Sequence, residues 1–351
     1  MAGVIDLVLL LFLVTIAYAS VRTKNLFEAA MLFGIFSLVS ASFFVVLDAV
    51  DVAMTEAAVG AGVSTILMLS TLAVTGHKVR PRPVQRNVLA IAVSVLLGAA
   101  LVYGTLDMPR IGDPDAPVQT HPIARHFIEV SPVETQIPNM VTPLLASYRG
   151  YDTLGETAVV FTAGIGVLAL IGRRRRRDGT PVEAGEGVDA MQDRHRVLRI
   201  VGKQLIPAIL LYACYVQAHG DFGPGGGFQA GVIFASALML FMLLVGIDEA
   251  EKVIKPKVLE KLIALGLLIY GCTGLLTVLK GGAFLDYKVL AHDPIHGLHY
   301  GILAVELGVG ITVTAVITTI IFTFAGHMRG RQKLVAPATD GTVVTTDGGA
   351  L

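Results

Sequence analysis

Residues 226–246 read GGFQAGVIFASALMLFMLLVG, a run of 21 residues without a charged side chain. A helix rises about 1.5 Å per residue, so it needs about 20 apolar residues to cross roughly 30 Å of hydrocarbon. This run meets both requirements. It predicts a membrane-spanning helix, and the rest of the chain can be examined for others.

The composition of the whole chain agrees with that prediction. Of the 351 residues, 54% are hydrophobic and only 15% are charged, whereas a soluble globular protein carries about 25% charged residues. The formal net charge is zero, so we expect no nucleic-acid partner. Cys214 and Cys272 lie inside apolar runs, which predicts small core side chains rather than a disulfide.

Nine apolar runs are long enough to span, so the expected fold is all-α, a polytopic bundle of about nine transmembrane helices. Strands are not expected, because unpaired strand edges are not tolerated in lipid. The first run contains Asp6 and no basic segment precedes it, which favours a spanning helix over a cleaved signal peptide. The runs are 4–21, 26–47, 52–75, 87–106, 153–171, 200–218, 226–246, 258–279 and 299–325.

The basic residues predict the direction of these helices. If the nine runs alternate, 22 of the 27 Lys and Arg residues fall on the side opposite the N-terminus. Cytoplasmic loops are enriched in Lys and Arg, so that side is expected to be cytoplasmic. The N-terminus is then outside and the C-terminus inside. The five basic residues on the outer side are Arg110, Arg125, Arg149, Lys280 and Lys288.

Two long connections and a tail lie between or after these runs. The outer loop 107–152 holds seven of the 15 prolines; it is expected to be ordered, and proline is expected to exclude a regular helix. The segment 173–199 starts with five arginines and predicts a basic cytoplasmic linker. The tail 331–351 is rich in Thr, Gly and Ala and is predicted to be disordered.

Three glutamates lie within or at the start of predicted spans, where ionisable residues are costly and usually functional. Glu56 and Glu306 are flanked by small residues that let a second helix approach and enclose the carboxylate. Both are candidates for ion or proton translocation. The alternative for Glu56 is a carboxylate at the level of the outer lipid headgroups, and the alternative for Glu306 is a structural hydrogen bond to a neighbouring helix. Glu156 opens the fifth run, so a role in translocation competes with capping of the helix N-terminus.

Four further residues are secondary candidates for the same chemistry. Glu28 and Lys203 lie near the cytoplasmic ends of their runs, where long side chains can reach the headgroups. Asp152 precedes Glu156, and His219 precedes a glycine-rich segment.

That segment, HGDFGPGGGFQAG at 219–231, is the most distinctive stretch of the chain. Pro224, Gly225, Gly226 and Gly227 do not favour a regular helix, which predicts a broken helix whose backbone faces a cavity or another chain. The alternative is a tight turn with close helix packing. A nucleotide-binding glycine loop is excluded because no strand precedes it.

His292, His296 and His299 gather before the last run, where interfacial or pH-responsive histidines are favoured over a metal site. The sequence has no Cys/His ligand pattern, no nucleophile motif and no cofactor fingerprint. We therefore expect no metal, no cofactor and no enzymatic activity on a soluble substrate.

Three stretches resemble families of membrane subunits. Residues 25–34 (NLFEAAMLFG) and 51–60 (DVAMTEAAVG) resemble the MbhD family, a three-helix module. Residues 148–156 (YRGYDTLGE) resemble the MbhE family, a two-helix module. Residues 219–228 (HGDFGPGGGF) resemble MnhB, also called MrpB, a four-helix subunit. Three, two and four helices match the nine apolar runs.

The MbhD and MbhE modules form the C-terminal part of the large MrpA subunit of Mrp-type Na⁺/H⁺ antiporters. The chain therefore resembles a fusion of a detached MrpA tail with MrpB. The resemblance implies that Glu56 and Glu156 line a cation or proton route, while Glu306 rests on the physical argument alone. The implied units are 1–86 (MbhD-like), 87–172 (MbhE-like), 173–199 (linker), 200–330 (MnhB-like) and 331–351 (tail).

The resemblance implies a subunit of a multi-subunit Na⁺/H⁺ antiporter in the bacterial inner membrane. Its partners would be other Mrp subunits, membrane lipid, Na⁺ and H⁺. Three alternatives stay open: a membrane-arm subunit of a hydrogenase-like or complex-I-like respiratory assembly, a scaffold without an ion path, and a self-sufficient channel.

Overall fold

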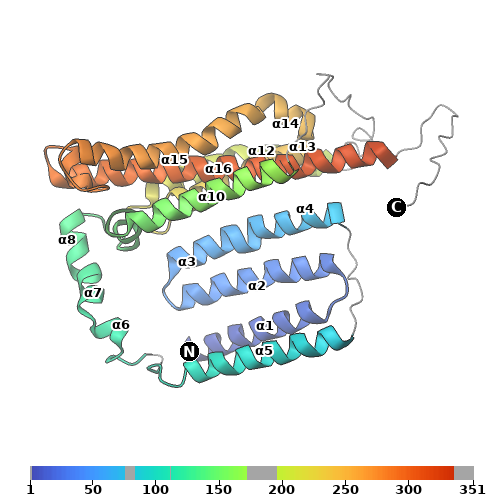
Figure 1. Ribbon diagram of the computed structural model, residues 1–351, viewed down its shortest axis with the longest axis horizontal. Helices are drawn as coiled ribbons and strands as arrows, with labels where there is room; N and C mark the ends of the chain where they lie inside the picture. The colour runs from blue at the N-terminus through green and yellow to red at the C-terminus, as the bar shows by residue number, and fades with distance from the viewer. Residues whose placement is uncertain (1, 76–83, 111, 172–195, 336–351) are drawn as a thin grey trace.

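The structure is a computed structural model that describes residues 2–75, 84–110, 112–171 and 196–335. Within those residues the chain is helical and has no strand, as the sequence predicts. Long helices run side by side, and short helices and turns join them at the ends (Figure 1). The protein is a polytopic helical membrane bundle.

The N-terminal unit has three candidate spans, which lie side by side in a row (Figure 1). Its first two are α1 (Ala2–Arg22) and α2 (Leu26–Val46), and Asn25 caps α2 by accepting a hydrogen bond from the Phe27 N–H at 3.1 Å. The third candidate span runs through α3 (Val50–Thr55), η1 (Glu56–Ser64) and α4 (Thr65–Thr75). Its middle part, η1, is a π-helix, which the hydropathy of the sequence does not reveal.

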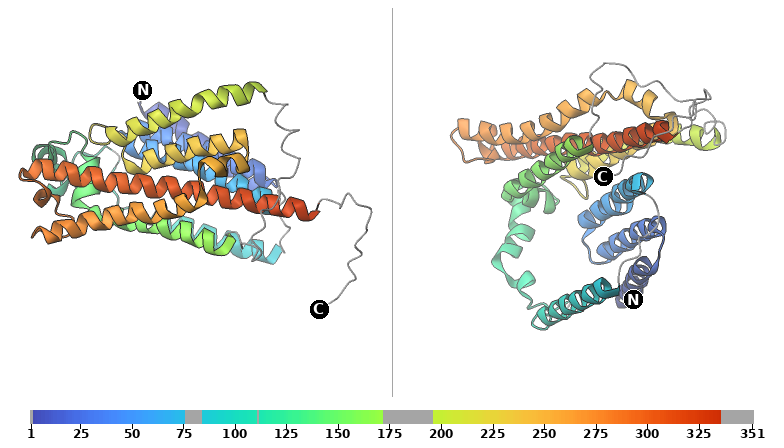
Figure 2. Two further views of the ribbon diagram at one scale, coloured as in Figure 1. Left: turned by 90° about the horizontal axis from the view of Figure 1, so that it is seen from above. Right: turned by 45° about the vertical axis from the view of Figure 1, so that its right-hand side comes forward.

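Five long helices form the second, larger group (Figures 1 and 2). They are α10 (Gly150–Ile171), α12 (Arg196–His219), α13 (Gly227–Val245), α15 (Pro256–Leu279) and α16 (Pro294–Val335). A short helix, α14 (Ile247–Val253), links α13 to α15.

The last helix, α16, is the centre of this group. Of its apolar window 61% is buried, against 0% for α1. The approach of α15 to α16 depends on small residues, since a Cβ built on Gly266 would lie 2.3 Å from the carbonyl oxygen of Gly308. Such backbone contact between spanning helices is what small residues allow. Residues on α16 are therefore positioned by several neighbours.

Eight helices of the described residues are long and apolar enough to cross a membrane. The expected fourth run forms α5 (Val84–Gly104), whose described apolar part, Val88–Gly104, is shorter than the other eight. Figure 1 shows that α4 ends at one end of the bundle and α10 begins at the other, with α5 running between these ends. The 21 residues of α5 correspond to about 31 Å of helix. A ninth crossing by α5 stays a prediction.

The described residues of the outer loop, 107–110 and 112–152, are ordered. The prediction that proline excludes regular helix there is wrong for 122–135. Pro122 starts α7 (Pro122–Arg125), where its missing N–H costs nothing. The π-turn η2 (His126–Val130) then leads into α8 (Ser131–Thr135), which holds Pro132 in its first turn. The remaining short elements are α6 (Pro117–Thr120), α9 (Val141–Pro143) and η3 (Leu144–Tyr148).

Two further expectations need correction. The sequence predicts disorder from residue 331 onward. Instead, α16 extends beyond the apolar run, which ends at residue 325, and continues to Val335. Cys214 and Cys272 are free and exposed rather than core residues, because they lie on outward faces of their helices. The linker up to residue 195 and the tail from residue 336 lie outside the described residues.

Candidate functional site

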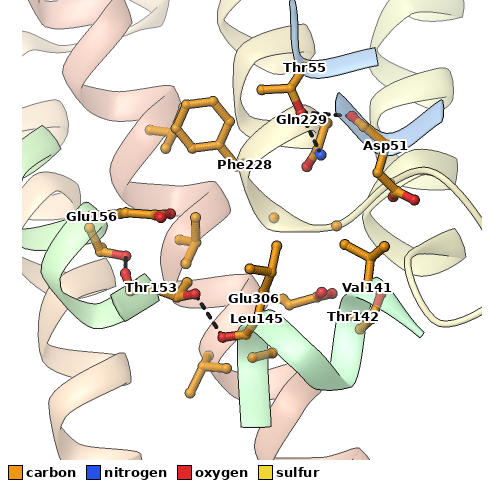
Figure 3. A pocket seen from close by; sticks show the side chains of 18 of the residues that line it. Asp51, Thr55, Val141, Thr142, Leu145, Thr153, Glu156, Phe228, Gln229 and Glu306 are labelled. Atoms are coloured by element: carbon orange, nitrogen blue, oxygen red, sulfur yellow. Dashed lines mark hydrogen bonds between the residues drawn. The ribbon is translucent and has the colours of Figure 1, made fainter. Parts of the chain in front are cut away.

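A cavity of roughly 620 Å³ lies where the two helical groups meet. Its walls come from α3, α9, η3, α10, the start of α13 and α16 (Figure 3). Most of the lining is apolar, and the polar part consists of carboxylates, hydroxyls and one amide. Its polar residues are Asp51, Thr55, Thr142, Thr153, Glu156, Thr157, Gln229 and Glu306.

Glu306 enters the cavity from the central helix α16. Its carboxylate lies against the α12–α13 turn: Oε1 is 3.0 Å from the point where a Cβ on Gly226 would lie, and Oε2 is 3.3 Å from that point on Gly220. The start of α13 provides partial positive charge there, which favours an anion. A carboxylate in the spanning part of α16 is thus placed beside one helix end and open to a cavity.

Glu156 lines the same cavity from α10. The helix begins at Gly150, so Glu156 lies in its second turn and does not cap it. Asp152 is the acidic residue of the first turn, and its carboxylate pairs with Arg149 at 2.5 Å on an exposed face. The structure therefore brings Glu156 and Glu306 into one cavity and leaves Asp152 as a residue of the helix end.

Glu56 lies outside this cavity. It begins η1, and its Oε1 lies 2.7 Å from the Cβ position of Gly60, beside the hydroxyl of Ser37 on α2. The carboxylate thus faces α2, whereas Asp51 and Thr55 of the preceding turn line the cavity. The π-helix places Glu56 at a local change of helical geometry, and such segments often accompany functional sites.

Asp51 is a cavity carboxylate that the sequence analysis did not select. It accepts hydrogen bonds from the backbone N–H of Gly225 and from the amide of Asn139, the latter at 3.5 Å. Asn139 also donates to the carbonyl oxygens of Gly220 and Gly223, at 3.1 and 3.0 Å. Thr142 donates to Gly220 as well, at 2.6 Å. The outer loop is thereby fastened to the α12–α13 turn.

One further hydrogen bond joins the two helical groups at the cavity. The amide of Gln229 on α13 donates to the hydroxyl of Thr55 on α3, at 3.0 Å (Figure 3). Gln229 lies two residues after the glycine run, inside an otherwise apolar stretch, so its polarity was a signal that sequence reasoning could have used. Asp51 carried a similar signal as a second acid at the start of the third span.

The glycine-rich segment is a tight turn rather than a broken helix. α12 ends at His219 and α13 begins at Gly227, with Gly226 at a φ of 101°. The N–H of Gly226 donates to the carbonyl of Val216 at 3.1 Å, which closes the turn on α12. Only glycine adopts this φ without strain. Gly225, Gly226 and Gly227 nevertheless line the cavity, as expected of a backbone that faces one.

The other secondary candidates lie away from the cavity. Glu28 accepts hydrogen bonds from Thr23 and Asn25 at the start of α2, and its side chain is exposed. Lys203 is exposed on α12. His219 stacks on Tyr215, with ring centroids 4.8 Å apart. Glu28, Lys203 and His219 thus lie at helix ends or on the surface of the protein.

The three histidines before the last span separate in the structure. His299 lies 3.6 Å from the carboxylate of Asp221 in the α12–α13 turn, and its Nε2 lies 3.0 Å from the carbonyl oxygen of Thr135. His296 instead pairs with Asp293 at the surface. Burial raises the pKa of Asp221 above its usual range, and His299 opposes part of that effect. In the part of the chain that the structure describes, no group of three or more His, Cys, Asp and Glu side chains is placed to hold a metal ion.

Comparison with known proteins identifies the C-terminal group. Residues 197–319 match the family model described as a domain related to the MnhB subunit of Na⁺/H⁺ antiporter. Antiporter subunit mnhB2 of Staphylococcus haemolyticus is 34% identical over 139 residues, which cover 39% of this chain and 98% of that protein. The chain belongs to the MnhB family of antiporter subunits. The mnhB2 subunit of Staphylococcus aureus (strain Newman) is 32% identical over the same length.

The rest of this MnhB-family chain matches two further family models. Residues 11–77 match the MbhD family model, and residues 81–185 match the MbhE family model, both described as subunits of MBH. The resemblance to MbhD, MbhE and MnhB is therefore confirmed. As a multi-pass protein with antiporter-subunit relatives, the chain belongs in the bacterial inner membrane.

Two solved structures share the fold. A chain of the Mrp complex from Dietzia sp. aligns with a TM-score of 0.72 and 27% identity over 91% of this chain. This chain spans only 34% of that longer one. A chain of the membrane-bound sulfane sulfur reductase, an archaeal respiratory membrane complex, aligns with a TM-score of 0.53 and 29% identity. That match covers 69% of this chain and 98% of the reductase chain.

Proposed function

We propose that this chain is a subunit of a multi-subunit antiporter that exchanges a monovalent cation, Na⁺, for protons. In this proposal Glu306 and Glu156 are the exchanging carboxylates. The observation that supports it most is their convergence on one cavity from α16 and α10, two helices long enough to span. Intramembrane carboxylates that face a cavity are typical of ion and proton pathways.

The chemistry requires no covalent step. A carboxylate in a region of low dielectric constant is stable only when its charge is compensated, and a proton or a cation can do this. Carboxylate, hydroxyl and carbonyl oxygens are the ligands that hard cations prefer. The cavity offers such oxygens from Asp51, Thr142 and Gln229 besides the two glutamates. Binding of Na⁺ and of a proton would then exclude each other, which is the basis of exchange.

Glu56 has a separate place in the proposal. It keeps the role that the family resemblance implies, a carboxylate on a cation or proton route. Because it faces α2 rather than the cavity, its route would involve the N-terminal row of helices or a partner subunit. The proposal also includes the division of the chain into the units 1–86, 87–172, 173–199, 200–330 and 331–351. It includes the position of the N-terminus outside the cell as well.

The partners in this proposal are the other Mrp subunits. Large apolar side chains are exposed along α1 and α5, for example Leu7 at 66% and Leu96 at 73%. Lipid or neighbouring subunits can cover such faces. The longer Mrp chain that this one matches in part agrees with assembly into a larger complex.

A second function has one observation in its favour. The likeness to a chain of a respiratory complex fits a membrane-arm subunit, in which the same carboxylates would move protons or Na⁺ for a redox partner. The scaffold alternative would leave the cavity carboxylates without a role.

The test compares transport by the assembled complex carrying Glu306→Gln, Glu156→Gln or both. Everted vesicles report antiport as Na⁺-dependent proton movement. The expected result is strongly reduced antiport for each variant at a normal amount of complex, with Glu249→Gln, whose side chain on α14 is exposed, as a matched control. Normal antiport by the double variant would support the scaffold alternative instead.

A further inference from the structure

At the α12–α13 turn, His299 of α16 approaches Asp221 of the turn, about 10 Å along α16 from Glu306. His299 lies on α16 seven residues before Glu306, on the same side of the helix. Its Nδ1 lies 3.6 Å from Asp221 Oδ2, and the two side chains are 34% and 28% exposed. The pair therefore touches solvent while remaining mostly enclosed.

Asp221 is linked to Glu306 through the turn that holds it. Its neighbour Gly220 lies against the Glu306 carboxylate, since a Cβ on Gly220 would lie 3.3 Å from Glu306 Oε2. The backbone of Asp221 is fixed as well, because its carbonyl accepts a hydrogen bond from the Asn139 N–H at 3.1 Å. His299, Asp221 and Glu306 thus form a series from the surface of the turn to the cavity.

We propose that His299 and Asp221 form a proton-transfer branch that connects Glu306 with the water at the α12–α13 end of the bundle. The proposal rests on the exchange role of Glu306. The proton moves from solvent to His299, then to Asp221, and then to Glu306, while the reverse sequence releases it. No bond other than those to the proton changes, so each step is balanced.

The surroundings of His299 suit such a transfer. Its two ring nitrogens face two acceptors, the Asp221 carboxylate and the Thr135 carbonyl oxygen at 3.0 Å. Imidazole gains and loses protons near neutral pH and can pass them between two partners. Burial raises the pKa of Asp221, which makes its carboxylate a better proton acceptor than an exposed aspartate.

The neighbouring titratable groups do not compete for this pair. Glu134 precedes Thr135 on α8, but it accepts a hydrogen bond from Tyr148 at 2.5 Å and pairs with His126. His219, at the end of α12, stacks between Tyr215 and Phe222. Beyond Glu306, the carboxylates facing the cavity are Asp51 and Glu156.

The experiment uses the assembled complex in everted vesicles whose lumen, the side predicted to face the α12–α13 turn, is loaded at a series of pH values. The rate of radioactive sodium flux is compared for wild type, His299→Gln and Asp221→Asn. We expect losses that grow as the lumen becomes alkaline and reach at least about tenfold, because a relay matters most where free protons are scarce. Imidazole in the lumen should restore the rate of His299→Gln.

His296→Gln is the matched control, because His296 also lies on α16 and pairs with an aspartate, Asp293, but its side chain is 70% exposed. It should keep the wild-type pH profile with and without imidazole. A wild-type profile for His299→Gln and Asp221→Asn would overturn the proposal. So would a loss that is equal at every pH and that imidazole does not reverse, since that outcome indicates a structural role.

Glu306→Gln separates this proposal from the proposed function. If Glu306→Gln abolishes transport while the His299 and Asp221 variants behave as wild type, the branch is wrong and the exchange role stands. If Glu306→Gln transports normally, the exchange role fails and the branch fails with it.

Discussion

Gly227 and Glu306 bring α13 and α16 into backbone contact beside the cavity: a Cβ on Gly227 would lie 2.0 Å from the carbonyl oxygen of Glu306. No side chain fits there unless the two helices separate. The same contact sets the distance between the Glu306 carboxylate and the glycine turn. The packing of two helices and the geometry of the candidate site therefore depend on one glycine.

Gly227→Ala should destabilise the protein by about 1–3 kcal/mol, the usual cost of overpacking, and should impair antiport. The measurement is the thermal unfolding temperature of the purified complex together with its transport rate. Gly271→Ala on α15 is the control, because nothing lies within 4 Å of the added Cβ. Equal unfolding temperatures for the two variants would show that the close contact is not required.

Thr55→Val should weaken the contact between the two helical groups. It removes the hydroxyl that accepts the 3.0 Å hydrogen bond from Gln229 and keeps the shape of the side chain. A fully buried donor left without a partner costs about 1–3 kcal/mol, and the half-buried Gln229 amide should cost up to about 1 kcal/mol. Thermal unfolding should detect this loss, and Thr71→Val on α4, whose hydroxyl bonds only within its own helix, should cause a smaller one. A larger loss for Thr71→Val would contradict the assigned interface.

Tyr270→Phe should destabilise the start of the helix that bears Glu156. The buried Tyr270 hydroxyl donates to the carbonyl of Gly150, the first residue of α10, at 2.8 Å. Its removal should cost about 1–3 kcal/mol and increase hydrogen exchange at the start of α10. Tyr103→Phe, at a residue 78% exposed, serves as the reference. Unchanged exchange in α10 would mean that this bond does not hold the helix.

Asp221→Asn should raise thermal stability at neutral pH relative to wild type. The pKa of Asp221 is raised in the folded state, so the folded protein holds this proton more tightly than the unfolded chain does. Stability therefore falls as pH rises from the unfolded pKa, about 3.9, through the folded pKa, and an amide avoids this loss. The difference in unfolding temperature should shrink as the pH is lowered from neutrality toward the unfolded pKa. A difference that grows on acidification would contradict the sign of the shift.

Sequence alone predicts most of this fold, because hydropathy reflects the length of a spanning helix directly. Each of the nine apolar runs becomes a helix, including 226–246, which forms α13. The π-helix η1 was not predicted, since its residues are as apolar and small as those of an α-helix there. Nor were the helical turns around Pro122 and Pro132, where proline occupies first-turn positions that tolerate it.

The candidate site was predicted only in part. The position of a residue along an apolar run indicates its depth in the membrane but not which other helices it faces. Glu156 and Glu306 were selected from their positions in apolar runs, and they share a cavity. Glu56 was selected by the same reasoning but faces α2. Thr55 lines the cavity, and the next residue of a helix is rotated by about 100° around its axis, so Glu56 points elsewhere. Asp51 and Asn139 belong to the site through contacts with segments far away in sequence, which no local pattern reveals.

The most direct test of the central claim measures protons released when Na⁺ is added to the purified complex in weakly buffered detergent solution. If Na⁺ and protons compete for Glu306, wild type should release protons on Na⁺ addition, and Glu306→Gln should release measurably fewer at the same amount of complex. Equal proton release by wild type and Glu306→Gln would contradict exchange at this carboxylate.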